Sequence, residues 1–115
     1  MIKGLLAVFL ACSTVLVFAA DTSDQEIEHL LTFVASADCS FERNGDQHTT
    51  VEASEHMRMK LDRGGLWIDT PEDFIKHAAT GSSISGKPYY VTCDKNKMTS
   101  SKWLHTELQR FRNHH

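Results

Sequence analysis

The segment "CSFERNGDQHTTVEASEHMRMKLDRGG", residues 39–65, contains the signals that decide the fold. Its first five residues alternate between apolar and polar and are followed by Asn-Gly at 44–45, which predicts a short strand ending in a turn. Residues 49–52 form a capping box, and the Gly-Gly pair at 64–65 is a helix stop. The segment therefore predicts a strand, a turn and a helix that ends near Arg63.

Three more helices are predicted outside this segment. A capping box at residues 23–26 opens a helix over 24–37, and Thr70-Pro71 opens another that stops near 80–81. The last helix begins near residue 100. Apolar residues at helical spacing are expected to be buried: Ile27, Leu30, Leu31, Val34, Val51, Ala53, Met57, Leu61, Phe74, Ile75, Ala78, Trp103, Leu104, Leu108 and Phe111. No internal repeat is visible.

A second strand is predicted over residues 88–93, followed by a polar loop over 94–99. If the two strands pair antiparallel with Cys39 opposite Cys93, Phe41 falls opposite Val91 and the apolar residues share one face. We expect the two cysteines to form a disulfide, worth roughly 4 kcal/mol in the chain-entropy model. The predicted fold is a small α+β domain of four helices and a two-stranded antiparallel sheet.

The first twenty residues predict export. A basic start, an apolar run over residues 4–18 and the small residues Ala19 and Ala20 are typical of a secretory signal peptide. Cleavage is expected after Ala20, with Ala19 as the second choice. The run is shorter than the about 20 residues of a membrane span, so no transmembrane segment is expected in the mature chain. Cys12 leaves a lipoprotein as the alternative. The prediction is a periplasmic protein whose residues 21–115 form a single domain.

Charge and metal-ligand spacing exclude several classes of partner. The formal net charge is −3, and it becomes −4 when the leader with Lys3 is removed. This balance gives no electrostatic reason to expect nucleic acid or an anionic membrane as partner. The seven histidines are scattered and no HExxH motif is present, so neither a metal nor another cofactor is expected.

The stretch "GSSISGKPYY", residues 81–90, matches the first positions of a phosphate-binding loop. Such a loop follows a strand, opens a helix and has Ser or Thr after its Lys. Here the segment follows a helix, leads into a strand and has Pro88 after Lys87, so no nucleotide is expected. Its hydroxyl and ammonium groups leave two interpretations, a solvated loop or a contact site for a small anion or a glycan.

One group of residues leaves catalysis open. Glu52 and His56 lie close on the predicted second helix, and Arg58 and Lys60 follow. This pattern is typical of a solvated helix face with charge pairs. The alternative is that His56 acts as a general base, assisted by Glu52, in a small envelope hydrolase or lyase.

Four ordered motifs carry a family resemblance: "FERNGDQHT", "EASEHMRMKL", "TPEDFIKHAA" and "SSISGKPYYV". Together they resemble the YfeK-like family of short exported proteins of Gram-negative bacteria, a domain of unknown function. The resemblance covers about residues 26–111. It implies a single periplasmic domain and brings no catalytic residues.

The polar parts of these motifs suggest one surface site. If the two strands are neighbours, Arg43 and Lys87 approach one another. The candidate ligand-binding residues are Arg43, Asn44, His56, Lys60, Ser82, Ser83, Ser85 and Lys87. We therefore expect a non-enzymatic binding or accessory module of the cell envelope, with an unknown envelope protein, a glycan or a small anion as its partner.

Overall fold

The computed structural model describes residues 22–114. The predicted signal peptide, its cleavage after Ala20 and the alternative lipid site at Cys12 lie outside these residues.

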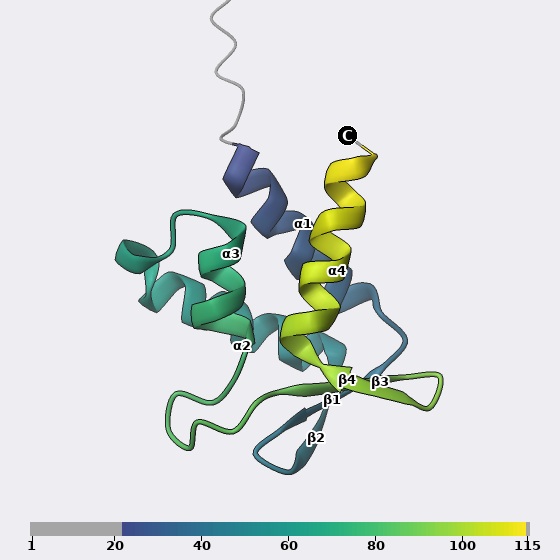
Figure 1. Ribbon diagram of the computed structural model, residues 1–115. Helices are drawn as coiled ribbons and strands as arrows, with labels where there is room; N and C mark the ends of the chain where they lie inside the picture. The colour runs from purple at the N-terminus through teal and green to yellow at the C-terminus, as the bar shows by residue number, and fades with distance from the viewer. Residues whose placement is uncertain (1–21, 115) are drawn as a thin grey trace, which may run out of the picture.

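The described chain is an α+β domain in which the helices gather on one side of an antiparallel sheet (Figure 1). The strands lie in the order β2-β1-β3-β4. In chain order the elements are α1 (Thr22–Ser36), β1 (Ser40–Arg43), β2 (Asp46–Thr49), α2 (Thr50–Arg63), η1 (Gly65–Trp67), α3 (Pro71–Phe74), η2 (Ile75–Ala79), β3 (Tyr90–Cys93), β4 (Asn96–Thr99) and α4 (Ser100–Asn113). The prediction of a two-stranded sheet was therefore wrong, because β2 and β4 extend it on both edges.

Both edge strands were missed for a physical reason. They read DQHT and NKMT, and neither shows the alternation of a strand with one buried face. Each follows a two-residue turn in which both residues have positive φ: Asn44 and Gly45 in one hairpin, Asp94 and Lys95 in the other. Asn-Gly is a common sequence for such a turn, whereas a lysine at a φ of 70° is not. The second hairpin therefore has almost no local signal.

The central strands pair as the sequence predicted. Phe41 lies opposite Val91 in the antiparallel β1–β3 pair, and both side chains are buried. Cys39 and Cys93 form a disulfide at the end of this pair, with Cα atoms 4.5 Å apart. The predicted disulfide and the predicted register are confirmed.

The sheet and two helices form a structural repeat. The unit β1-β2-α2 is followed by the equivalent unit β3-β4-α4, and the two units meet at the antiparallel β1–β3 pair. Thr49 and Thr99, fifty positions apart, cap α2 and α4 with their side chains. No other residue of the two units is identical at this spacing, so the sequence alone did not reveal the repeat.

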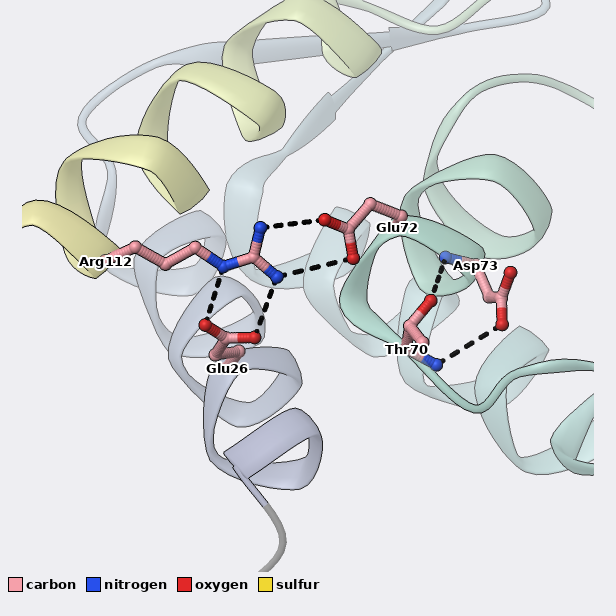
Figure 2. Close-up of polar contacts among 5 residues, drawn as sticks. All are labelled: Glu26, Thr70, Glu72, Asp73 and Arg112. Atoms are coloured by element: carbon pink, nitrogen blue, oxygen red, sulfur yellow. Dashed lines mark hydrogen bonds and ion pairs between the residues drawn. The ribbon is translucent and has the colours of Figure 1, made fainter.

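The predicted helix starts are largely confirmed. Thr49 and Glu52 form the capping box of α2, which ends at Arg63 as predicted. Thr70 and Asp73 form the capping box of α3, with Pro71 at its first position (Figure 2). The helical chain then continues through Ala79 as the π-helical turn η2.

The predicted core was right except at a few positions. Val51 is 52% exposed, because it lies on the outer side of the first turn of α2. Leu61 and Phe111 are only partly buried. The other predicted core residues are buried. Tyr89, which was not predicted, is one of the largest fully buried side chains.

Arg112 joins three helices. From the last turns of α4 it donates to both carboxylate oxygens of Glu26 in α1 and to Glu72 in α3 (Figure 2). Glu26 is largely buried, so this ion pair satisfies a carboxylate that has little access to water. The pair secures the end of the domain that lies opposite the sheet.

Candidate functional site

One face of α2 and the end of β1 form a basic hollow. His56, Lys60 and Arg63 are four and seven positions apart, so they share a face of the helix. Arg43, the last residue of β1, lies beside them. The hollow has a volume of about 420 Å³ and is lined by Arg43, Asn44, His56, Met59, Lys60, Arg63, Ser82, Ser83, Ile84 and Tyr89.

The structure brings most of the predicted ligand-binding residues together. Six of the eight line this hollow: Arg43, Asn44, His56, Lys60, Ser82 and Ser83. The two remaining residues do not. Ser85 instead donates to the side-chain oxygen of Asn44, which fastens the loop to the β1–β2 turn. Lys87 also lies outside the hollow.

A short polar chain forms the inner wall of the hollow. The Lys60 ammonium donates to the carbonyl of Gly81 at 3.0 Å and to the Tyr89 hydroxyl at 3.2 Å. That hydroxyl lies 3.4 Å from Nε2 of His56. When Nε2 carries no proton, the hydroxyl accepts from Lys60 and donates to His56. Lys60 therefore fixes both the loop and the buried phenol.

The hollow disfavours further positive charge. Burial lowers the pKa of His56, and the nearby charges of Arg43 and Lys60 lower it further. Burial, with a contribution from Arg43, also lowers the pKa of Lys60. Burial raises the pKa of the Tyr89 phenol. Burial is the larger cause of both shifts, and the added effect of the neighbouring cations indicates a positive potential in the hollow.

The lining of the hollow contains no Asp or Glu. Within residues 22–114, the guanidinium groups of Arg43 and Arg63 make no hydrogen bond or ion pair with another residue. Other arginines of the domain differ, since Arg58, Arg110 and Arg112 each bind a glutamate. The hollow therefore holds cationic donors that are available to an anion.

The loop before β3 is not a phosphate-binding loop. It closes on itself through an isolated bridge between Gly81 and Pro88. Five of its backbone N–H groups bond within the loop, to the carbonyls of Ser82 and Lys87 or to the hydroxyls of Ser82 and Ser85; they belong to Ser82, Ile84, Ser85, Gly86 and Lys87. These N–H groups are therefore not directed at a ligand, and no helix begins at the loop.

Glu52 does not orient His56. Its carboxylate accepts from the backbone N–H of Thr49 in the capping box and lies 3.7 Å from His48. The backbone hydrogen bond from Thr49 is the main reason that the pKa of Glu52 is lowered. His56 instead faces Tyr89. The arrangement lacks the carboxylate that holds a catalytic histidine in many hydrolases.

The described residues contain no group of three or more His, Cys, Asp or Glu side chains arranged to hold a metal ion. Among the helices over residues 22–114, none combines the length and apolarity needed to cross a membrane.

Comparison with known proteins identifies the family. The model of a family of unknown function, DUF5329, matches residues 21–112. The chain belongs to this family. It is also 52% identical over 52 residues to the uncharacterised protein YfeK of Salmonella typhimurium, an alignment that spans 45% of the chain and 43% of that protein. The YfeK-like resemblance is thereby confirmed. No solved structure matches the chain.

Four lining residues of this DUF5329 domain were missed by sequence reasoning. Arg63 had a signal, because it continues the helical spacing of His56 and Lys60 by one turn. Met59 had a similar signal, because it lies three positions after His56 on the same helix. Ile84 and Tyr89 had none, since their position at the hollow depends on how the loop before β3 folds onto α2.

Proposed function

We propose that this DUF5329 domain is an exported, non-enzymatic binding module of the cell envelope, and that its basic hollow takes a small anionic group of the phosphate type. The observation that carries the proposal is the convergence of Arg43, Lys60 and Arg63 on a hollow lined by no carboxylate. Arginine forks and lysine ammonium groups are the usual donors to phosphate oxygens. Asn44 and Ser83 add neutral donors on the same wall.

The electrostatics of the free site support an anion. Burial is the main reason that the pKa values of His56 and Lys60 are lowered, and repulsion from neighbouring cations adds to it; a ligand with negative charge offsets that repulsion. It also supplies the partner that Arg43 and Arg63 lack within the described residues. A neutral glycan gains from the hydroxyl-bearing wall but leaves the positive potential in place, so the charged ligand is the stronger proposal.

Export is part of the proposal. The disulfide between Cys39 and Cys93 is compatible with an oxidising compartment such as the periplasm. The predicted signal peptide over residues 1–20 would direct the chain to export.

A hydrolase or lyase with His56 as general base is the second candidate. The lowered pKa of His56 favours the neutral imidazole that a base needs. However, Glu52 is engaged in the cap of α2, and the described contacts of His56 include no serine or cysteine nucleophile. We therefore favour binding over catalysis.

Titration with inorganic phosphate tests the proposal. Isothermal calorimetry at low salt should give saturable binding to the mature protein. Arg43→Gln and Arg63→Gln should each weaken it by about tenfold, the loss of one charge-assisted contact. Lys102→Gln, which removes an exposed charge on α4, should bind as the wild type does.

Lys87→Ala separates this site from a phosphate-binding loop. Because Lys87 lies outside the hollow, its replacement should leave the phosphate affinity unchanged. If the wild type does not bind phosphate, or if Lys87→Ala abolishes binding while Arg43→Gln does not, the proposal is wrong.

A further inference from the structure

Large apolar side chains stand in solvent on both sides of the basic hollow. Leu66 is 93% exposed and Trp67 is 74% exposed, both in the short turn η1 that follows α2. Ile84, in the loop before β3, is 96% exposed and lines the hollow from the other side. In Figure 1 both segments project at the left of the view, away from α4.

A second hollow connects the two apolar segments. It has a volume of about 310 Å³ and is lined by Lys60, Arg63, Gly64, Trp67, His77 and Ser83. Lys60, Arg63 and Ser83 line both hollows, so the hollows adjoin along the last turns of α2. The second hollow is also free of Asp and Glu in its lining. Together they form one basic groove with Trp67 at one end and Ile84 at the other.

Single apolar side chains scattered over a protein surface are ordinary, but the exposed apolar side chains of this domain are clustered. The described residues contain four exposed large apolar side chains, and three of them flank the groove. The fourth, Val51, is less exposed and lies outside both hollows. Each side chain at the groove stands at the tip of a turn or loop, where nothing in the fold requires an apolar residue.

We propose that this face docks on a bilayer that contains anionic phospholipid, with a headgroup phosphate in the basic hollow of Arg43, Lys60 and Arg63, which neither Leu66 nor Trp67 lines, and with Leu66, Trp67 and Ile84 in the interface. The inference rests on the proposed anion site and names the source of its phosphate. Tryptophan is favoured at the level of lipid headgroups, because its ring is apolar and its N–H remains hydrogen bonded. Basic residues beside inserted apolar side chains are the usual composition of an interfacial anchor.

Charge complementarity favours a lipid surface over a free anion. A dissolved phosphate contacts only the cations of the hollow, and it leaves the side chains of Leu66, Trp67 and Ile84 in water. A bilayer with phosphodiester headgroups gives these cations an anionic partner and at the same time removes the exposed apolar side chains from water. The formal net charge of −4 expected once the leader with Lys3 is removed from the −3 of the full chain does not oppose this docking, because local charge at short range outweighs distant charge that salt screens.

Vesicle sedimentation tests the inference with the mature protein. Vesicles of phosphatidylethanolamine with phosphatidylglycerol should bind the wild type, and vesicles of phosphatidylcholine alone should not. The double variant Leu66→Ser/Trp67→Ser should lower vesicle binding at least about tenfold, since it removes two inserted side chains. It should keep the phosphate affinity of the wild type. Val51→Ser is the matched control and should bind vesicles normally.

The outcomes separate the two proposals. Arg63→Gln should weaken both vesicle and phosphate binding, because the same guanidinium serves both. A wild type that binds phosphate but ignores anionic vesicles overturns the lipid inference and leaves the anion site intact. A wild type that binds neither overturns both. If the Leu66 and Trp67 changes alter the oligomeric state and leave vesicle binding intact, these side chains serve a protein interface and the inference is wrong.

Discussion

Replacing Arg112 by methionine should cost the domain about 2 kcal/mol of unfolding free energy. Glu26 gives both carboxylate oxygens to Arg112, and its side chain is only 9% exposed. Removing one member of a fully buried ion pair costs about 3–5 kcal/mol, since the other charge is left without a partner. Because the Arg112 side chain is 35% exposed, water offsets part of that loss. The second, more exposed contact with Glu72 adds little.

Arg110 provides the matched control on the same helix. It binds Glu107, whose side chain is 6% exposed, so Arg110→Met also removes one charge from a buried glutamate. Glu107 keeps a second partner, because His29 lies 2.6 Å from its carboxylate. The expected cost is therefore about 0.5 kcal/mol, as for a surface pair.

Urea unfolding at neutral pH measures both variants. Arg112→Met should also lower the melting temperature by about 10 °C, given about 4–8 °C per kcal/mol for a domain of this size. The pKa of Glu72 is lowered chiefly by its hydrogen bonds with Arg112. The folding stability that the Glu72–Arg112 contact contributes is therefore fully present above the ordinary glutamate pKa of 4.5. It is lost as the pH falls through the lower pKa of Glu72 in the folded protein. The difference in unfolding free energy between wild type and Arg112→Met should therefore narrow only slightly in acid, because the Glu72 contact contributes little. Equal losses for the two variants would refute the reasoning.

Three further predictions concern the disulfide, the site and export. Replacing Cys39 and Cys93 together by alanine should lower the unfolding free energy by about 4 kcal/mol in urea titration, since the bridge closes a long loop; a loss below about 1 kcal/mol would contradict the chain-entropy account. In an NMR titration, His56 should have a pKa below 6.5 in the protein without ligand, and phosphate should raise it, because an anion favours the imidazolium; a fall on adding phosphate would argue against the anion site. Intact-mass analysis of the periplasmic fraction should find a chain that starts at Asp21 or Ala20, whereas a lipidated chain starting at Cys12 would disprove simple cleavage.

The sequence by itself determined the features that depend on near neighbours. The capping box that begins at Thr49 and the helix start at Thr70-Pro71 were predicted correctly, because each depends on residues no more than three positions apart. The end of α2 at Arg63 was also predicted from a local signal, the Gly-Gly pair that follows it. The disulfide and the Phe41–Val91 pairing were also predictable, since the part of the chain after the predicted leader has two cysteines and two predicted strands, which leaves few other arrangements.

Only the tertiary structure decided the edge strands, the repeat and the completed hollow. The edge strand β4 is polar and follows a turn with Lys95 at positive φ, so its own residues give no strand signal. It is a strand because it pairs with β3. The contact of Tyr89 with His56 joins residues 33 positions apart, and it forms only when the loop before β3 packs on α2. Arg43 and Lys60 were grouped correctly from sequence, but the lack of a carboxylate around them is a property of the packed surface. Local hydrogen bonds are encoded over a few residues, whereas a binding surface depends on which distant segments the core brings into contact.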